Sequence, residues 1–462
     1  MNEMQKNNDF LANEPVGKLL FRLAIPTVTA QLINMLYNIV DRIYIGHMPG
    51  SGNLALTGVG ICMPIIIIIS AFAALVGMGG SPRASIALGR GDTKSAEDIL
   101  GSCFTLQTIV AIVLTVIVFI FRRPMLMAFG GSVNTIDYAT DYLGIYSLGT
   151  LFVQLTLGMN VFITAQGFAR TGMFTVLIGA VLNIALDPLF IFAFDMGVKG
   201  AALATIVSQG ASCIWVLKFL TGKTTTLRIR KENLRIRPKV ILPCLALGVS
   251  PFIMQASESV ISICFNSSLL KYGGDMAVGA MTIFTSVIQL AMLPLNGIAQ
   301  GAQPITSYNY GAGNVDRVKK SFRLLLVTSI VYAAVLWAFV MICPKTFAGI
   351  FTNDAALIDF CGKMMRVYCG AIVVFGLQIA CQMTFIAIGN AVCSIIAAVV
   401  RKFVLILPLI YIMPAVMNDK TMAVYMAEPV SDVLAVTFTV ILFSIQFKKA
   451  IRNLESKSKA SA

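Results

Sequence analysis

Five polar side chains lie at helical spacing in the first long apolar stretch of the chain, which runs from Leu23 to Ile45. Successive members are 4, 3, 4 and 3 residues apart: Thr27, Gln31, Asn34, Asn38 and Asp41. Because an α-helix has about 3.6 residues per turn, this spacing places all five on one helix face. A carboxylate that faces lipid at mid-bilayer costs about 2.5–3.5 kcal/mol. We therefore expect the polar face to point toward other helices or a water-filled cavity.

A second polar pair lies farther along the chain, where Asn183 and Asp187 are followed by Pro188. Residues four apart share one side of a helix, so both side chains point the same way. Two carboxylates such as Asp41 and Asp187, in a medium of low dielectric constant, either share protons or hold a cation between them. The oxygens of Asn183 and Thr205 suit Na⁺ and equally suit a proton relay. The alternative is that Asn183 and Asp187 only hold helices together.

Composition identifies the setting of these residues. The 462-residue chain is 57% hydrophobic and only 12% charged, whereas soluble domains carry about 25% charged residues. About twelve apolar runs are near or above the roughly 20 residues that cross a bilayer. Residues 1–15 are polar and the first run is long and polar-striped, so we expect no cleavable signal peptide. The predicted spans are residues 16–45, 53–80, 95–121, 136–167, 172–194, 198–220, 240–270, 276–302, 318–342, 357–389, 392–416 and 423–447.

The net charge of +14 is distributed unevenly between the loops. With the N-terminus inside, roughly 24 Lys and Arg lie on the inner side and about 9 on the outer side, which predicts that both termini are cytoplasmic. We expect a multi-pass protein of the cell (inner or plasma) membrane, with no nucleic-acid partner because the basic residues flank spans. Arg401 and Lys402 lie inside the eleventh run. They either snorkel to the inner surface or serve as counter-ions for Glu258 or for an anionic group of a substrate.

The chain divides into two similar halves. We predict a six-helix lobe at residues 1–222, a basic cytoplasmic linker at 223–238, a second six-helix lobe at 239–448 and a cytoplasmic tail at 449–462. A motif repeats at an offset of 222: Gly79-x-x-Pro82-x-x-Ser85-x-x-x-Gly89-x-Gly91 and Gly301-x-x-Pro304-x-x-Ser307-x-x-x-Gly311-x-Gly313. Each lobe has an even number of spans, so the repeat is parallel and its axis lies along the membrane normal. The predicted fold is all-α, with 12 transmembrane helices in two pseudo-symmetric lobes around a central cavity.

The two lobes differ in their polar residues. The seventh span corresponds to the first and has the polar residues Gln255 and Glu258, but Phe265 stands at the level of Asp41. The eleventh span corresponds to the fifth and has no polar residue at the positions of Asn183 and Asp187. We therefore predict that only the N-terminal lobe carries paired carboxylates within the membrane.

Taken in order, these features resemble the multidrug and toxic compound extrusion (MATE) family. The resemblance rests on the two six-span lobes, on the Gly-x-x-Pro loops, on Pro26 and Asp41 in the first span, and on the motif Asn183-x-x-x-Asp187-Pro188. The DinF-like, Na⁺-drug antiporter-like branch is the more similar one. The resemblance implies cation-coupled efflux of amphipathic, mostly cationic or aromatic compounds. It also implies that Asp41, Asn183, Asp187 and Thr205 form the Na⁺ or H⁺ coupling site. The chain departs from the other branch at Glu258, which lies one turn beyond that branch's glutamate.

Further assignments complete the prediction. Substrate contacts are expected from the polar face of the first span, the break in the fourth span and the seventh span: Gln31, Asn34, Tyr37, Met159, Asn160, Gln255 and Glu258. Pro26 and Pro188 are candidate hinges, since a proline removes a helix hydrogen bond. No cofactor is expected beyond the coupling ion, Na⁺ or H⁺, and the transporter is expected to be a monomer.

Two other functions stay open at this stage. A flippase for lipid-linked oligosaccharides or polysaccharides shares the two-lobe plan, although such proteins typically place several cationic side chains in the cavity. An intramembrane enzyme needs a nucleophile with a base or a metal cluster, and the chain has one histidine and no His-Glu-x-x-His motif.

Overall fold

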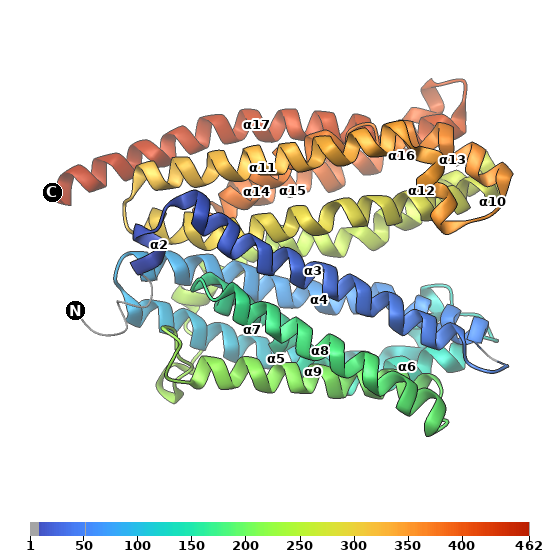
Figure 1. Cartoon of the computed structure of the whole chain (residues 1–462), viewed down its shortest axis with the longest axis horizontal. Helices are drawn as coiled ribbons and strands as arrows, with labels where there is room; N and C mark the ends of the chain where they lie inside the picture. The colour runs from blue at the N-terminus through green and yellow to red at the C-terminus, as the bar shows by residue number, and fades with distance from the viewer. Residues whose placement is uncertain (1–8, 51, 462) are drawn as a thin grey trace.

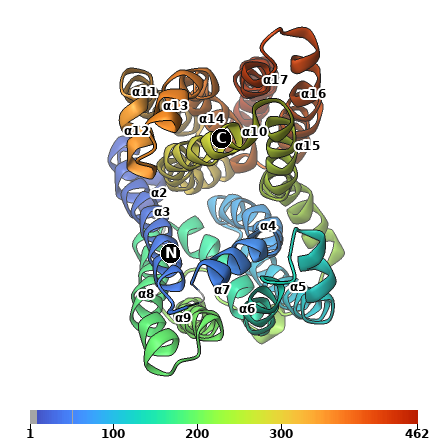
Figure 2. The same cartoon turned by 90° about the vertical axis from the view of Figure 1, so that its right-hand side faces the viewer.

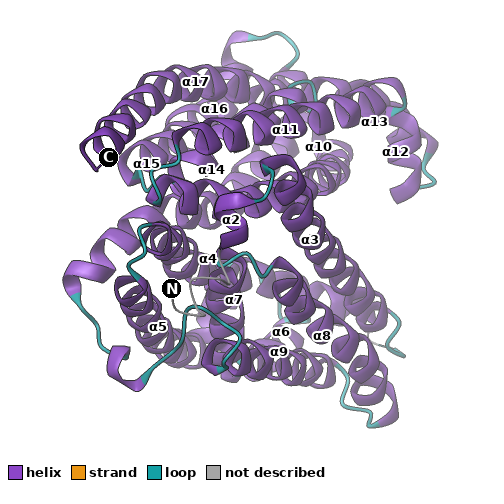
Figure 3. Cartoon of the chain, turned by 60° about the vertical axis from the view of Figure 1, so that its left-hand side comes forward, coloured by secondary structure: helices purple, strands orange, loops and turns teal. Residues whose placement is uncertain are grey.

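The computed structural model describes residues 9–50 and 52–461, and every regular element in this part of the chain is a helix (Figures 1 and 3). The N-terminal half comprises α2 (Asp9–Asn13), α3 (Val16–Gly46), α4 (Gly52–Gly89), α5 (Thr93–Ala128), α6 (Ile136–Leu148), α7 (Thr150–Ala165), α8 (Ala169–Pro188), the π-helix η1 (Leu189–Ala193) and α9 (Val198–Thr221). The C-terminal half comprises the 3₁₀-helix η2 (Lys231–Asn233), α10 (Pro238–Gly311), α11 (Val315–Ile342), α12 (Pro344–Phe351), α13 (Ala355–Tyr368), α14 (Ile372–Ala387), α15 (Ala391–Val399), the π-helix η3 (Val400–Leu405), α16 (Ile406–Val416) and α17 (Lys420–Ser461).

Twelve membrane crossings account for these helices. Nine described helices are long and apolar enough to span a bilayer, and two bent pairs, α6 with α7 and α13 with α14, each form one more span, with bends of 57° and 43°. The helix α10 counts as one of the nine but holds two spans, because Gly274 (φ 64°, ψ −163°) reverses the chain between its two arms. Figure 1 shows the arms side by side, from light green to yellow. The chain is therefore a multi-pass helical membrane protein.

Two expected interruptions take a different form in the structure. The fourth span breaks at Gly149, between α6 and α7, rather than near Met159 and Asn160, which lie within the regular helix α7. Pro26 lies inside α3 without ending it. The hydroxyl oxygen of Thr27 lies 3.1 and 2.9 Å from the carbonyl oxygens of Leu23 and Ala24, next to the hydrogen bond that proline removes.

The internal repeat appears as matched contacts. Ser85 donates a hydrogen bond from its Oγ to the carbonyl of Ala165 at 3.2 Å, and Ser307 donates to Ala387 at 2.8 Å. Both partners are shifted by the same 222 residues as the motif. Figure 2 shows the consequence, with the blue-to-green helices in one bundle and most of the yellow-to-red helices in the other. The two pseudo-symmetric lobes predicted from the sequence are confirmed.

Close backbone contacts join the lobes. A Cβ on Gly89 of α4 would clash with the Tyr308 carbonyl of α10, and a Cβ on Gly311 of α10 would clash with the Ile86 carbonyl of α4. These reciprocal contacts exist because glycine lets two backbones approach without a side chain between them. The hydroxyl of Thr27 on α3 also donates to the Gly297 carbonyl on α10 at 2.6 Å. The helices α3, α4 and α10 therefore form the interface between the lobes.

The segment between α9 and α10 packs against the N-terminal lobe. The side-chain oxygen of Gln166 accepts hydrogen bonds from the Thr225 hydroxyl at 2.8 Å and from the Leu227 amide at 2.9 Å. Arg230 pairs with Glu97 at 3.3 Å. This basic segment therefore stays with the lobe that precedes it.

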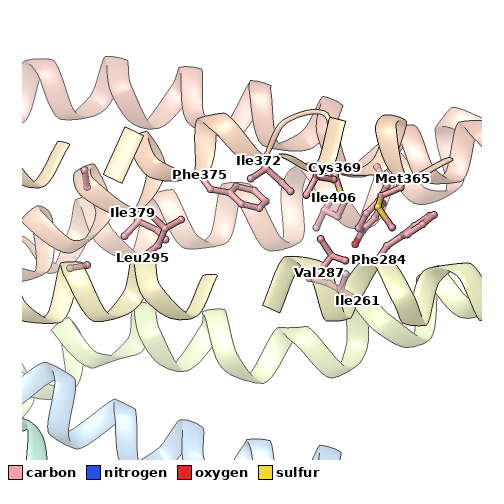
Figure 4. Close-up of a cluster of buried hydrophobic side chains, with 14 of the residues drawn as sticks. Ile261, Phe284, Val287, Leu295, Met365, Cys369, Ile372, Phe375, Ile379 and Ile406 are labelled. Atoms are coloured by element: carbon pink, nitrogen blue, oxygen red, sulfur yellow. The ribbon is translucent and has the colours of Figure 1, made fainter. Parts of the chain in front are cut away.

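The C-terminal lobe has an aromatic core. Phe284 stacks on Tyr368 with ring centroids 5.6 Å apart and meets Tyr425 edge-on at 5.3 Å. The Tyr425 hydroxyl donates to the Ala277 carbonyl at 2.7 Å. Figure 4 shows Phe284 close to Met365 and Cys369, with Phe375 and Ile379 farther along the same cluster. Arg401 and Lys402 lie in the helix η3 of this lobe.

The contact between α4 and α10 predicts the effect of one small substitution. A Cβ on Gly248 of α10 would clash with the Leu75 carbonyl of α4, whereas a Cβ on Gly60 of α4 meets nothing within 4 Å. Both changes to alanine gain the same helix propensity, about 1 kcal/mol. Gly248→Ala is nevertheless expected to destabilise the protein by about 1–3 kcal/mol relative to Gly60→Ala, because overpacking forces the backbones apart. Thermal unfolding in detergent measures the difference, and equal melting temperatures would contradict the contact.

Candidate functional site

Asp41 lies near the end of α3, where the helix is otherwise largely apolar. Its side chain is buried, and its Oδ1 atom has no hydrogen-bond partner among the described residues. The polar face of the first span brings Asp41 inward, while Leu36, Ile39 and Ile43 on the other side of the helix are exposed to the bilayer. A buried carboxylate without a partner is unfavourable unless a proton or a cation accompanies it.

Asn183 and Asp187 face Asp41 from α8. Their side chains point the same way, as the i, i+4 spacing predicts, and the Asn183 amide donates from Nδ2 to Asp187 Oδ1 at 3.3 Å. The same amide lies 3.5 Å from the Thr205 hydroxyl on α9. Asp187 is fully buried, and directly after Pro188 the helix widens into the π-helix η1. A π-turn at this point is typical of helices that carry functional groups.

The carboxyl groups of Asp41 and Asp187 lie within hydrogen-bonding reach of each other. Asp41 Oδ1, Asp187 Oδ2 and Asn183 Oδ1 are all buried, and none has a hydrogen-bond donor among the described residues. Acceptor oxygens without donors gather here from two helices, and the hydroxyl of Thr205 adds a further oxygen from α9. The structure thus brings together all four residues that the resemblance implies for an ion site.

This arrangement suits a small hard cation or a proton. Carboxylate, amide and hydroxyl oxygens are the ligands of hard ions, and a proton shared by two carboxyl groups removes their repulsion. Among the described residues no group of three or more His, Cys, Asp or Glu side chains gathers to hold a metal. With one proton shared between the two carboxyl groups, the site carries a single negative charge, which matches a monovalent cation.

Two tyrosines border the site. Tyr37 on α3 lies one turn before Asp41 and interacts electrostatically with both carboxyl groups. Tyr142 on α6 lies near the Thr205 side chain. Tyr37 was predicted as a substrate contact, and the structure places it beside the ion site. Tyr142 was not predicted, since no spacing within its span relates it to α9.

The predicted substrate contacts are dispersed. On α3, Gln31 donates to the Gln300 side chain of α10 at 3.4 Å, and the Asn34 carbonyl accepts from Asn38 at 2.6 Å. On α7, Asn160 donates to the Gly172 carbonyl at 3.2 Å and accepts from Thr175 at 2.9 Å, so both ends of its amide are occupied.

Met159 and Gln255 have different surroundings. Met159 is fully buried in the hydrophobic cluster of α4, α5 and α7, which leaves it no surface for a ligand in this structure. Gln255 is partly exposed on the first arm of α10, one turn before Glu258.

Arg401 and Lys402 do not snorkel to the surface. Both are buried in η3, with ion pairs to two different helices: Arg401 to Asp432 of α17 at 2.9 Å, and Lys402 to Glu258 of α10. The alternative in which Glu258 has a basic counter-ion in the eleventh span is therefore the correct one.

The prediction that only the N-terminal lobe carries paired intramembrane carboxylates is wrong. Glu428 and Asp432 lie four residues apart on α17, and Asp432 is buried. The signal was present in the sequence as Glu428-Pro429-x-x-Asp432, which repeats the i, i+4 spacing of Asn183 and Asp187. The lobes differ instead in their cations, because the C-terminal carboxylates have basic partners.

Comparisons with known proteins agree with this architecture. The MatE family profile matches residues 26–189 and 251–412. The multidrug export protein MepA of Staphylococcus haemolyticus (strain JCSC1435) is 23% identical over 404 residues, which cover 87% of this chain and 88% of MepA. The solved structure of the MATE multidrug transporter DinF-BH, a complex with a small molecule, is 32% identical and superposes with a TM-score of 0.85, covering 92% of this chain and 95% of that one.

A second solved structure shares the fold. It is an outward-facing conformation of a multidrug resistance MATE family transporter of the MOP superfamily, 22% identical with a TM-score of 0.90. The alignment covers 96% of this chain and 98% of that one.

The unpartnered oxygens predict that folding stability depends on a cation. Asp187→Asn introduces an amide donor next to Asp41, and we expect it to abolish a stabilisation by Na⁺ that the wild type shows. An ion that binds only the folded state adds about 1.4 kcal/mol at about ten times its Kd. Melting temperatures in nanodiscs at alkaline pH, in NaCl and in choline chloride of equal ionic strength, measure the effect.

The matched control for this test is Asp141→Asn, which removes an exposed carboxylate that pairs with Lys199 at 3.5 Å. It is expected to keep the wild-type response to Na⁺. If the wild type shows no response to Na⁺ at alkaline pH or to protons at lower pH, the two carboxylates do not form an ion site.

Proposed function

Because this chain belongs to the MATE family, we propose that it is a secondary-active multidrug efflux transporter, which exports amphipathic cationic or aromatic compounds in exchange for Na⁺ or H⁺. The observation that supports the exchange is the set of buried oxygens without donors at Asp41, Asn183 and Asp187. Such a site gains stability when an ion enters and loses it when the ion leaves. The ion can therefore shift the equilibrium between two conformations if only one of them forms the site.

The helix α3 links the ion site to the interface between the lobes. Asp41 lies near one end of α3 and Thr27, which donates to the Gly297 carbonyl of the other lobe, lies 14 residues earlier. At 1.5 Å per residue these points are about 21 Å apart. Movement of α3 as the ion binds would thus be transmitted to the interface. Pro26 is adjacent to Thr27 and Pro188 to Asp187, so both proposed hinges lie where such movement needs a flexible helix.

The direction of transport rests on the orientation of the chain. We place both termini in the cytoplasm, as the excess of Lys and Arg in the corresponding loops supports. The glycine contacts between the lobes join the C-terminal end of α4 to that of α10, on the side of the basic linker. On this orientation the structure is closed toward the cytoplasm, as expected for a state that releases substrate outward.

A flippase for anionic lipid-linked sugars has less support. Its substrate needs free cationic side chains, and the two basic residues of the eleventh span, Arg401 and Lys402, are already paired with Asp432 and Glu258. Among the described residues, Asp41 and Asp187 form no ion pair with a basic side chain, and both keep a buried carboxyl oxygen without a donor. Cationic cargo and a cationic coupling ion match them better.

Proteoliposomes test the coupling directly. Efflux of a fluorescent organic cation is measured under an imposed pH gradient and, separately, under a Na⁺ gradient. The wild type is expected to respond to at least one gradient. In Asp41→Asn the response is expected to fall at least about tenfold, because the neutral amide cannot exchange a proton or neutralise a bound cation.

Asp275→Asn is the control, since it removes an exposed carboxylate from the turn between the arms of α10. It is expected to transport like the wild type. Gradient-driven efflux that persists unchanged in Asp41→Asn would refute the assignment of the coupling site. The gradient that drives the wild type identifies the ion.

A further inference from the structure

The C-terminal lobe contains an accessible ion pair within the membrane region. The Lys402 ammonium of η3 donates to Glu258 Oε1 of α10. The two side chains differ sharply in accessibility, since that of Lys402 is 9% exposed and that of Glu258 is 57% exposed. The buried ammonium therefore reaches outward to a carboxylate whose other side is open.

The neighbouring ion pair is closed by comparison. Arg401 binds Asp432 through Nη2 at 2.9 Å and Nε at 3.0 Å, and the side chains are 7% and 3% exposed. The guanidinium also lies 5.1 Å from the centre of the Phe375 ring. Consecutive residues of η3 thus serve two helices, which the wider turn of a π-helix allows. Arg401 with Asp432 is a structural pair, and Lys402 with Glu258 is the pair that an approaching molecule can reach.

Glu258 belongs to an exposed polar face of α10. Ser262 and Asn266 follow it at intervals of four residues, and all three are exposed. The exposed apolar residues Val260 and Ile263 lie on a different side of the helix, about 140–200° from Glu258 at 100° per residue. An apolar face contacts lipid, whereas an exposed face of Glu, Ser and Asn requires water. Glu258 therefore meets the aqueous side of the lobe and not the lipid.

Lys402 has a second acidic neighbour. Glu428 on α17 interacts electrostatically with both Lys402 and Arg401. A buried ammonium left without an acidic partner is strongly destabilising. When Lys402 releases Glu258, its ammonium still interacts electrostatically with the acidic side chains of Glu428 and Asp432. The lobe thus holds three carboxylates, at Glu258, Glu428 and Asp432, for two basic side chains.

We propose that Glu258 receives the cationic group of the substrate in the C-terminal lobe, and that Lys402 is a built-in competitor whose ammonium occupies this position in the absence of substrate. This inference rests on the proposed export of organic cations and names a recognition residue for them. Binding of a monovalent organic cation at Glu258 moves Lys402 toward Glu428. Lys402 thereby sets a threshold of affinity, so that only cations with sufficient apolar contact displace it.

Equilibrium binding of two isosteric probes tests the exchange. Tetraphenylphosphonium carries one positive charge, and tetraphenylborate has nearly the same shape with one negative charge. In nanodiscs, Lys402→Met is expected to lower the Kd of the phosphonium at least about tenfold, a change at the low end of measured couplings between close charged groups. The Kd of the borate is expected to stay constant or to rise. Glu258→Gln is expected to raise the Kd of the phosphonium.

The double variant Glu258→Gln with Lys402→Met separates this role from general packing. If Lys402 acts through Glu258, the double variant binds the phosphonium as weakly as Glu258→Gln alone, and melting temperatures confirm that each variant is folded. Lys345→Met is the matched control, because it removes an exposed lysine that pairs with Asp359 at 2.6 Å. It is expected to leave both Kd values unchanged.

Several results would overturn the inference. An unchanged phosphonium Kd in Lys402→Met, or a decrease that persists in the double variant, removes the competitor role while cation efflux by the wild type still supports the proposed function. Equal tightening of phosphonium and borate shows that Lys402 acts by shape and not by charge. Absence of phosphonium binding in every variant, together with absence of cation efflux, refutes the inference and the proposed function alike.

Discussion

The close approach of the Asp41 and Asp187 carboxyl groups sets a requirement for the rest of the structure. Two carboxyl groups from α3 and α8 approach within hydrogen-bonding reach and are buried, and their free oxygens lack donors among the described residues. Such groups are stable together only with a proton or a cation, whose exchange with water requires that the lobe open. The helix α3 carries Asp41 and also contacts the second lobe through Thr27, so it connects this pair of acids to the interface between the lobes.

The two lobes satisfy buried acids in opposite ways. In the N-terminal lobe Asp41 and Asp187 have no basic partner and, on the proposed function, share an exchangeable ion, while in the C-terminal lobe basic side chains of η3 pair with Glu258 and Asp432. Both solutions use a π-helix in the equivalent span, the fifth and the eleventh. The repeated backbone thus carries acids without basic partners in one half and acids paired with basic side chains in the other. Both halves keep the glycine contacts that hold them together.

Local spacing revealed a large part of this arrangement. Apolar length located the spans, and the offset of 222 located the repeat. The interval between Asn183 and Asp187 predicted that both side chains point the same way, and in the structure they form a hydrogen bond. Contacts between distant helices have no such signal. The partner of Arg401, the approach of Tyr142 to Thr205 and the complete burial of Met159 depend on how helices pack across the lobe. The break at Gly149 was not predicted, because a single glycine within a long apolar run does not distinguish a bent helix from a straight one.

The reciprocal contacts of Gly89 and Gly311 have a consequence for the closed end of the molecule. Near the same end the Arg317 guanidinium of α11 donates to the carbonyls of Leu11 and Glu14, while each glycine rests on a backbone carbonyl of the opposite lobe. A junction of this kind depends on shape and is indifferent to ionic strength, unlike a closure made of exposed salt bridges. Added salt is therefore expected to leave these glycine contacts unaltered. The tightness of the barrier and the selectivity of the transporter are thereby independent properties, which can vary separately as the chain changes.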